Sequence, residues 1–486
     1  MTLVGGFLLV FKKGENPFEL RKSQRSNPAS ITTSGVYDFF TIFGETNSLN
    51  MKYFLSCISF LIVLHSHSQN PNPSSILDEY IQGEMEEEHF PGTTTVIVKD
   101  GEIVWIQSYG FADIENGIPV SDSTQFLLAS MSKLFTGTAT MQLKENGILE
   151  LDDDINEHLP WPLQHPVQSA TPMTIQQLMT HTSSIKDNWS AMGDYYGYPD
   201  PTMSLEDCMQ DYFTLAGGNY DANQNFISEA PGTVRNYSNM ATALNGYITE
   251  IVSATPFDDY CDASIFDPLC MEKTAWHMAD LDSNEVARPY SYSNGNFVAN
   301  PHYGFADYPD GQLRSSSLDL ANFMIAFLNG GNLGGNTILT PSSVNEMWTE
   351  QIPSIQNSQG LNWYKELLYY SGGEAYLWGH NGGEMGVSTD MYVDPELNIG
   401  VCVLSNGSGT NLYICDALYD YALSLNSNNG IVPACSSVGL TNLKPSQKKL
   451  IQILDVLGRE TTFKPNTPLI YVYDDGSIEK VFRVAY

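Results

Sequence analysis

Two strand-rich ends around a helix-rich middle are the feature that most constrains the fold of this chain. Strand-like runs over 94–98 and 103–106 flank Lys99-Asp100-Gly101, which is a strong hairpin-turn signal. Strand-like runs return from Leu361 onward, whereas helical spacing dominates much of the chain between. We therefore expect an α+β fold of the broad α/β class. One antiparallel sheet forms from both ends, helices flank it, and a helical subdomain is inserted.

The size and charge of the chain limit which classes of fold and partner are possible. Its 486 residues, 42% of them hydrophobic, suffice for one large domain or two to three average ones. The formal net charge of -34 at pH 7 repels nucleic acid and anionic membranes, so we expect neither as a partner. A strongly acidic, soluble surface fits a protein that works outside the cell.

Residues 51–68 have the pattern of a signal peptide, with a basic start at Met51-Lys52 and an apolar run before Gln69. Such a signal belongs at an N-terminus, so we interpret residues 1–50 as an upstream extension absent from the mature protein. The run is too short to cross a bilayer comfortably, and we expect no transmembrane helix in the mature chain. The protein would then be secreted, periplasmic or held at the cell surface. The alternative is an internal anchor with a cytoplasmic extension.

Ser130 and Lys133 form the strongest candidate for chemistry. They lie between the strand-like run 125–128 and the helix-like run 134–143, so both fall on the first turns of an apolar helix. A serine hydroxyl needs a neighbouring base to become a nucleophile, and a lysine three positions away can supply one. The same spacing recurs elsewhere, but no other copy opens an apolar helix; these copies are Ser183 with Lys186, Ser446 with Lys449 and Ser477 with Lys480.

Acyl transfer requires a further proton carrier and an oxyanion hole. Tyr237-Ser238-Asn239, just before a helical pattern, can supply the carrier, with Asn239 as an amide that fixes Lys133 or a substrate carbonyl. A second triplet, Tyr292-Ser293-Asn294, runs into a glycine turn and is interpreted as a hairpin loop.

A third motif, His380-Asn381-Gly382-Gly383, falls on a predicted strand. A backbone N–H there can lie beside the serine, and the glycines allow close approach of a substrate. His302-Tyr303-Gly304 has the same spacing without an adjoining strand, and we assign His181 a structural role.

The cysteines give no metal site. No pair has the spacing of a zinc knuckle, and His, Asp and Glu do not cluster around them, so we expect no metal and no other cofactor. In an exported protein they could form disulfides in about 15 connectivities, among which the sequence cannot choose. The six after the signal are Cys208, Cys261, Cys270, Cys402, Cys415 and Cys435.

In the order Ser130…Lys133, Tyr237…Asn239 and His380…Gly382, the three motifs resemble those of one family. It is the serine beta-lactamase, penicillin-binding and D-alanyl-D-alanine carboxypeptidase family, specifically its class C-like branch with related esterases. The resemblance covers roughly residues 75 to 425, and it implies a beta-lactamase/transpeptidase-like fold. Supporting segments are 151–153, 159–160, 178–183 and 311–316.

The resemblance also implies roles for individual residues. Ser130 would be the acylated nucleophile, Lys133 and Tyr237 the shared general base and acid, and Asn239 an anchor of the lysine or the substrate. The backbone N–H groups of Ser130 and Gly383 would form the oxyanion hole.

At two positions that bear on substrate choice, this sequence differs from the pattern usual in the family. His380 replaces the lysine usual in the beta-lactamases, and Asn381 replaces a hydroxyl residue that often helps to hold a substrate carboxylate. A histidine with an ordinary pKa of about 6.5 is mostly neutral at about pH 7.5. We therefore expect a preference for neutral esters and amides, unless Lys365 or Arg314 reaches the site. Activity on carboxylate substrates should rise as the histidine becomes protonated.

The end of the chain differs from the rest. After the hydrolase domain at 69–425, a polar linker at 426–445 leads to strand-like segments in 446–486. This small β tail resembles the C-terminal sorting tail of type IX secretion substrates, which would make secretion machinery a partner. The alternative is a set of extra strands packed on the catalytic sheet.

Two hypotheses for function remain. The first is an exported serine hydrolase that forms a covalent acyl-serine intermediate with esters, amides or cell-wall peptides. The second is a non-catalytic sensor or binder of cell-wall fragments that keeps the fold. The presence of Ser130, Lys133 and Tyr237 together favours the enzyme, because a binder has no need of all three.

Overall fold

A computed structural model describes residues 70–425, 429–433, 435, 450–455, 459, 469–473 and 478–481. The extension predicted at 1–50 and the signal peptide predicted at 51–68 lie outside these residues, as does most of the linker predicted at 426–445. The chain divides into two compact units, the second of which begins at Cys435.

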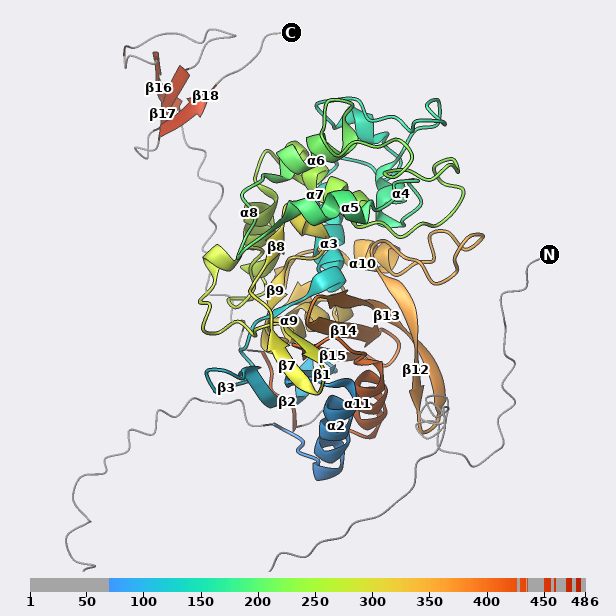
Figure 1. Ribbon diagram of the computed structural model, residues 1–486, viewed down its shortest axis with the longest axis vertical. Helices are drawn as coiled ribbons and strands as arrows, with labels where there is room; N and C mark the ends of the chain where they lie inside the picture. The colour runs from blue at the N-terminus through green and yellow to red at the C-terminus, as the bar shows by residue number, and fades with distance from the viewer. Residues whose placement is uncertain are drawn as a thin grey trace, which may run out of the picture. The chain divides into compact units, whose positions relative to one another are not determined.

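A seven-stranded antiparallel sheet organises the first unit (Figure 1). Its strand order is β12-β13-β14-β15-β1-β2-β3. β1 from the start of the domain pairs with β15 from its end, with Val96 opposite Cys402. The two strand-rich ends therefore close one sheet, as expected. The strands are β1 (Gly92–Lys99), β2 (Glu102–Asp113), β3 (Ile118–Pro119), β12 (Tyr364–Tyr370), β13 (Gly373–Glu384), β14 (Val387–Asp394) and β15 (Ile399–Ser405).

The hairpin between β1 and β2 turns where the sequence predicts. Lys99 pairs with Glu102, which leaves Asp100 and Gly101 as a two-residue loop. Both have positive φ, 52° and 83°, and Asp and Gly tolerate this left-handed backbone better than most residues.

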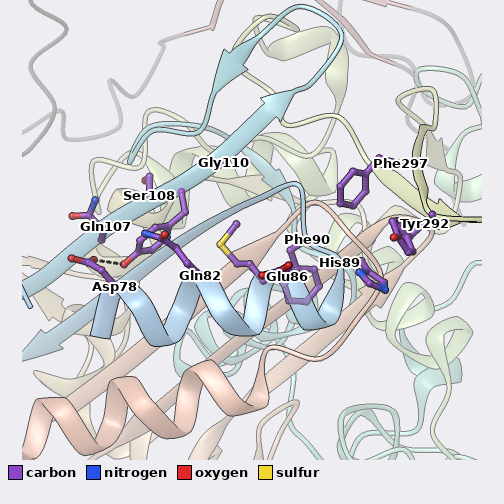
Figure 2. A pocket seen from close by; sticks show the side chains of 13 residues that line it. Asp78, Gln82, Glu86, His89, Phe90, Gln107, Ser108, Gly110, Tyr292 and Phe297 are labelled. Carbon is purple, nitrogen blue, oxygen red and sulfur yellow. Dashed lines mark hydrogen bonds between the residues drawn. The ribbon is translucent and has the colours of Figure 1, made fainter. Parts of the chain in front are cut away.

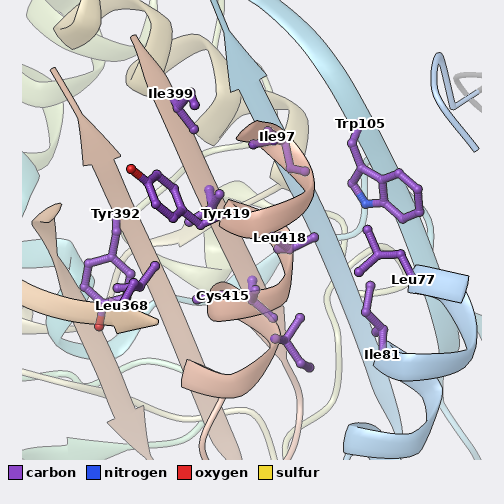
Figure 3. Close-up of a cluster of buried hydrophobic side chains, with 14 of the residues drawn as sticks. Leu77, Ile81, Ile97, Trp105, Leu368, Tyr392, Ile399, Cys415, Leu418 and Tyr419 are labelled. Carbon is purple, nitrogen blue, oxygen red and sulfur yellow. The ribbon is translucent and has the colours of Figure 1, made fainter. Parts of the chain in front are cut away.

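Two helices cover one face of the sheet, α2 (Ser75–Glu88) and α11 (Leu412–Ser424). Figure 3 shows their apolar side chains directed at the strands: Leu77 and Ile81 from α2, and Leu418 from α11. These side chains are buried together with residues of the central strands, so the helices are held mainly by the hydrophobic effect.

Other helices build the remainder of the unit. α9 (Ser317–Leu328) packs on β1 and β15, and α3 (Lys133–Glu145) packs on α7 (Asn239–Ser253). The rings of Phe135 and Phe323 stack with centroids 4.2 Å apart, which ties α3 to α9. The inserted helices are α4 (Ile175–Met179), α5 (Trp189–Met192), α6 (Leu205–Phe213), α7, α8 (Phe257–Cys261) and α10 (Pro341–Met347).

Short elements connect the helices and the sheet. The strands are β4 (Phe126–Leu127), β5 (Tyr196–Gly197), β6 (Tyr290–Ser293), β7 (Asn296–Ala299), β8 (Gly304–Phe305), β9 (Arg314–Ser315), β10 (Asn332–Leu333) and β11 (Asn336–Thr337). The single-turn helices are η1 (Ala129–Ser132), η2 (Ile155–Glu157), η3 (Gly193–Tyr195), η4 (Asp262–Phe266), η5 (Met278–Asp280) and η6 (Tyr308–Asp310).

The second unit contains a small antiparallel sheet in the order β16-β17-β18. Its strands are β16 (Leu450–Asp455), β17 (Leu469–Tyr473) and β18 (Ile478–Val481). The sequence predicts strands in these segments, and the role of the tail as a sorting signal stays a prediction.

Three observations bear on partners and cofactors. In the described part of the chain, no helix is both long and apolar enough to span a bilayer. The same residues contain no group of three or more His, Cys, Asp or Glu side chains placed to hold a metal ion. Among the described residues, four cysteines are buried free thiols, namely Cys208, Cys261, Cys402 and Cys415.

Candidate active site

Ser130 lies in a tight turn between β4 and α3. The preceding residue, Ala129, has a φ of 49°, a left-handed conformation that costs an alanine about 1–2 kcal/mol. The surroundings hold this turn in place: the N–H of Leu128 donates to the carbonyl of Leu313 at 2.8 Å, and the hydroxyl of Thr389 donates to the carbonyl of Leu128 at 2.7 Å. Such locally strained backbone is typical of functional sites.

Lys133 is completely buried, and its ammonium group has three acceptors. Its Nζ atom lies 3.1 Å from Ser130 Oγ, 2.7 Å from Asn239 Oδ1 and 2.6 Å from the carbonyl oxygen of Asp310. An ammonium has three N–H donors, so every proton of Lys133 is used. The lysine is therefore held in one orientation with one donor directed at the serine.

The charge state of Lys133 follows from opposing influences. Burial lowers its pKa, whereas Tyr237, Asp310 and Asp187 raise it, and the net direction is upward. Burial also raises the pKa of Asp307, to about 7, and that of Asp310. In the resting site Lys133 is thus protonated, and burial disfavours ionisation of the nearby carboxyl groups of Asp307 and Asp310.

Tyr237 lies beside this lysine. The Nζ atom of Lys133 is 5.2 Å from the centroid of its ring, and the ring of His181 packs against it at 4.3 Å. The hydroxyl of Tyr237 is buried and donates no hydrogen bond within the described residues, and its proximity helps to raise the pKa of Lys133. A buried hydroxyl proton without an acceptor is costly unless function requires it, so Tyr237 is suited to exchange a proton.

Asp187 fixes the start of α7, which carries Asn239. Its carboxylate accepts from the hydroxyl of Ser238 at 2.9 Å and from the backbone N–H groups of Asn239 and Met240 at 3.0 and 3.2 Å. A carboxylate at a helix N-terminus satisfies donors that the helix cannot. Burial raises the pKa of Asp187, although these bonds oppose that shift.

β13 presents an open edge to the site. β12 pairs with residues 373–379 of β13, so residues 380–384 are paired only on their β14 side within the described chain. The N–H of Asn381 donates to the hydroxyl of Tyr364 at 3.1 Å, which shows that it points to the open edge. Because N–H groups alternate along a strand, that of Gly383 points the same way. Gly383 is thus suited to donate to a substrate.

The glycines of β13 have different surroundings. A Cβ atom on Gly382 would lie 2.2 Å from the carbonyl oxygen of Leu128 and 3.1 Å from Cβ of Ala129, so the strand passes close to the turn that carries Ser130. A Cβ on Gly383 would meet no atom within 4 Å, which places this residue beside open space.

His380 departs from the expected titration. It is buried, and the desolvation lowers its pKa to about 3, with the charges of Lys133 and Arg235 acting in the same direction. Its Nδ1 donates to the carbonyl of Asn381 at 2.5 Å, which leaves Nε2 as an acceptor. An ordinary pKa for His380 was therefore a wrong expectation, because a buried imidazole close to two cations stays neutral near pH 7.

The other groups considered for carboxylate recognition are engaged elsewhere. The Asn381 side chain accepts from the hydroxyl of Tyr364 at 2.7 Å. Lys365 forms an ion pair with Glu350 at 2.8 Å, and buried Arg314 donates to backbone carbonyls. Neither cation reaches toward Ser130.

Comparisons with known proteins identify the family of this chain. A family model described as Beta-lactamase matches residues 77–425, most of the chain. The chain belongs to the beta-lactamase family. Protein flp of Staphylococcus aureus (strain N315) is similar, with 26% identity over 332 residues, 68% of this chain. The match spans 62% of the length of that relative. A beta-lactamase of Yersinia enterocolitica is 24% identical over 72% of this chain and 91% of its own.

Solved structures show the same fold as this beta-lactamase-family chain. The octameric penicillin-binding protein homologue from Pyrococcus abyssi gives a TM-score of 0.57 at 23% identity, over 84% of this chain and 89% of its own. EstCE1, a hydrolase with promiscuous acyltransferase activity, gives 0.53 at 20% identity, over 71% and 98%. The mixed fold with a large antiparallel sheet and flanking helices is thereby confirmed.

The second copies of the three motifs lie in surroundings that do not fit a catalytic role. Ser183 is buried in a loop that supports Ile185, and Tyr292 lies in the hairpin of β6 and β7, whose turn Asn294-Gly295 has positive φ. His302 lies outside the described helices and strands, and burial lowers its pKa to about 4.

Sequence reasoning missed several neighbours of the site. Arg235 lies only two residues before Tyr237 in the sequence, and that position is a signal that could have found it. Asp187 belongs to no motif in the sequence. Tyr364 and the carbonyl of Asp310 carry no sequence signal, since only folding brings them to β13 and Lys133.

A large cavity lies away from these residues. It has a volume of about 870 Å³ and lies between α2, β2 and the β6–β7 hairpin. Figure 2 shows Gln82 and Glu86 of α2 along it, with Tyr292 and Phe297 of the hairpin at one end. Ser108 in its lining shares a hydrogen bond with the hydroxyl of Thr94 at 3.0 Å and has no lysine, histidine or carboxylate as a hydrogen-bond partner within the described residues. We therefore assign the chemistry to the cluster around Ser130.

Proposed function

We propose that this chain is a serine hydrolase that forms a covalent acyl intermediate on Ser130 with esters, amides or cell-wall peptides. The observation that carries the proposal is the 3.1 Å contact between Lys133 Nζ and Ser130 Oγ, made by a buried lysine whose other two donors are fixed. Ser130 itself is partly exposed, so a substrate can reach the hydroxyl that the lysine orients.

The chemistry divides into two acyl transfers. Ser130 Oγ attacks the substrate carbonyl, and the pair of Lys133 and Tyr237 moves its proton to the leaving group. Because Lys133 is already protonated, the Tyr237 hydroxyl accepts the serine proton as it releases its own. Water then attacks the acyl-enzyme and releases the acid and the free serine. The N–H groups of Ser130 and Gly383 are suited to bind the oxyanion in both steps.

The two groups of the pair are not equivalent. Each proton of Lys133 already has an acceptor, whereas the proton of the Tyr237 hydroxyl has none within the described residues. Tyr237 therefore has the unused hydrogen-bonding capacity that a proton carrier needs, and Lys133 supplies a fixed positive charge beside it.

Fluorophosphonate labelling with intact-mass analysis tests the proposal. The wild-type protein should gain one adduct, Ser130→Ala should gain none, and Ser183→Ala should label like the wild type. Turnover of an ester panel should fall by about 10⁶-fold in Ser130→Ala if the serine and its bases act as one unit. Adducts that persist in Ser130→Ala contradict the assignment. Labelling without any turnover of esters, D-amino-acid peptides or lactams would favour the binder instead.

We also propose that the protein is exported, on the signal-like pattern of residues 51–68. N-terminal sequencing of protein secreted by a bacterial host should give a chain that begins near Gln69. A mature protein that retains residues 1–50 contradicts this proposal.

A further inference from the structure

Arg235 lies at the edge of the candidate active site in the loop before α7. Its Cζ atom is 5.8 Å from the centroid of the Tyr237 ring, and the residue is partly exposed. The same Tyr237 ring lies 6.2 Å from the ring of His380 on β13, so Arg235, Tyr237 and His380 line one region. It belongs to the wall of the site, although the proposed acyl transfer does not use it.

A neutral side chain holds this guanidinium. Arg235 Nε donates to Gln359 Oε1 at 2.8 Å. Gln359 is buried, and its own amide donates to the carbonyls of Gly360 and Trp363 at 3.0 and 3.2 Å, which fixes its oxygen. The arginine is therefore positioned through one N–H without any loss of its charge.

The remaining donors of Arg235 are uncommitted. Within the described residues its two terminal amino groups make no hydrogen bond, and no carboxylate forms an ion pair with it. Lys365 nearby is different, since it pairs with Glu350 at 2.8 Å. An arginine held by one edge presents the planar fork that binds a carboxylate through two parallel bonds.

We propose that Arg235 binds a carboxylate group of the substrate and so makes carboxylate-bearing acyl compounds the preferred substrate class. This inference rests on the proposed hydrolase function. It reverses the preference for neutral substrates expected from β13 alone, because the positive charge comes from the loop before α7 and not from His380. The carboxylate could belong to a peptide C-terminus or to a lactam, which share this chemistry.

The kinetic test uses a matched pair of chromogenic thioester substrates, a free acid and its methyl ester. Wild-type protein should have the higher kcat/KM on the acid. Arg235→Gln should lower kcat/KM on the acid by about 10- to 100-fold, as expected for a charge-assisted pair, and change that on the methyl ester by less than about twofold. Arg235→Lys should recover part of the loss, since it keeps the charge without the fork.

Lys365→Gln is the matched control, because it removes a cation from the neighbouring strand that is already paired. It should leave the acid-to-ester ratio unchanged. Equal losses on both substrates in Arg235→Gln would show that Arg235 only supports Tyr237, and would overturn the inference. So would a wild-type protein that prefers the ester. A peptide acid and a lactam, each compared with its ester, then distinguish the two carboxylate sources.

A binding measurement separates this inference from the proposed function. In Ser130→Ala, which cannot turn over, calorimetry should find that the acid binds more tightly than the methyl ester, and Arg235→Gln in that background should remove the difference. Acid-selective binding without any Ser130-dependent turnover in the wild type would leave Arg235 supported and the hydrolase function refuted. Ser130-dependent turnover without acid-selective binding would support the hydrolase function and refute the role of Arg235.

Discussion

The side-chain oxygen of Asn239 accepts a hydrogen bond from Lys133 Nζ at 2.7 Å. This bond joins the first residue of α3 to the first residue of α7, two helices that pack against each other. Together with the carbonyl of Asp310, it leaves one ammonium donor for Ser130. The position of α7 therefore decides where the charge beside the serine lies.

Tyr237→Phe should separate catalysis from stability. The buried hydroxyl donates no hydrogen bond in the described part of the chain, so its removal should change the melting temperature little. If the hydroxyl carries a proton in the reaction, kcat should fall by about 10²- to 10⁴-fold. Thermal unfolding and ester kinetics on one protein sample check both parts. A variant that is destabilised but fully active would show that Tyr237 is structural.

Asp187→Ala should displace Asn239. Its loss leaves three donors at the start of α7 without their acceptor, at a cost of about 1–3 kcal/mol for each buried group. A small shift of the lysine anchor can cost about 100-fold in kcat. Asp194→Ala, which removes an exposed carboxylate seven residues further along the chain, serves as control and should retain wild-type stability and activity. Similar behaviour of the two variants would contradict this role.

The acid-to-ester selectivity should not titrate with His380. Its pKa of about 3 keeps the imidazole neutral from about pH 5.5 to 8.5, a range that brackets an ordinary histidine pKa of about 6.5. The kcat/KM ratio for the matched substrates should thus be flat across this range, and equally flat in His380→Gln. An inflection near pH 6.5 that disappears in the variant would show that His380 titrates normally.

The lowered pKa of His380 also predicts that the folded protein loses stability in acid. The unfolded chain takes up a proton on His380 below about pH 6.5, whereas the folded chain does so only near pH 3. This contribution to stability is complete above about pH 6.5 and is lost as the pH falls toward 3. Urea unfolding at several pH values should show a weaker acid-side loss in His380→Gln than in the wild type.

Asp390 changes the pH dependence of folding stability in the opposite direction to His380. It is buried on β14, where Tyr392 donates to it at 2.7 Å, and burial raises its pKa to about 7. Ionisation of the folded protein above its usual pKa is therefore unfavourable, and stability declines as the pH rises from about 4 to 7. Asp390→Asn keeps the acceptor without the charge, so the variant should gain on the order of 2 kcal/mol relative to wild type between about pH 5 and 8. A difference that does not change with pH would refute this.

A chain that ends at Ser436 should hydrolyse the same substrates at a similar rate. The site residues fall between Ser130 and Gly383, and the strands of the large sheet fall between Gly92 and Ser405. Kinetics and thermal unfolding of the shortened protein check this. Loss of folding or activity would show that the tail belongs to the domain rather than to secretion.

The sequence by itself determined the features that depend on residues close together in the chain. Ser130 and Lys133 meet because consecutive helical turns place residues three apart on one side, and Asp100-Gly101 turns a hairpin because both residues tolerate a left-handed backbone. The ordered motifs also indicated the fold, since strand and helix periodicities survive without knowledge of their contacts.

Only the tertiary structure decided the features that depend on distant contacts and burial. Asp187 reaches α7 across 51 residues, and Gln359 holds Arg235 across 124. The lowered pKa of His380 could not be predicted from the sequence. Its causes, desolvation and the charges of Lys133 and Arg235, arise only when the chain is packed. Sequence therefore determined which groups could react, and folding decided their charge and their anchors.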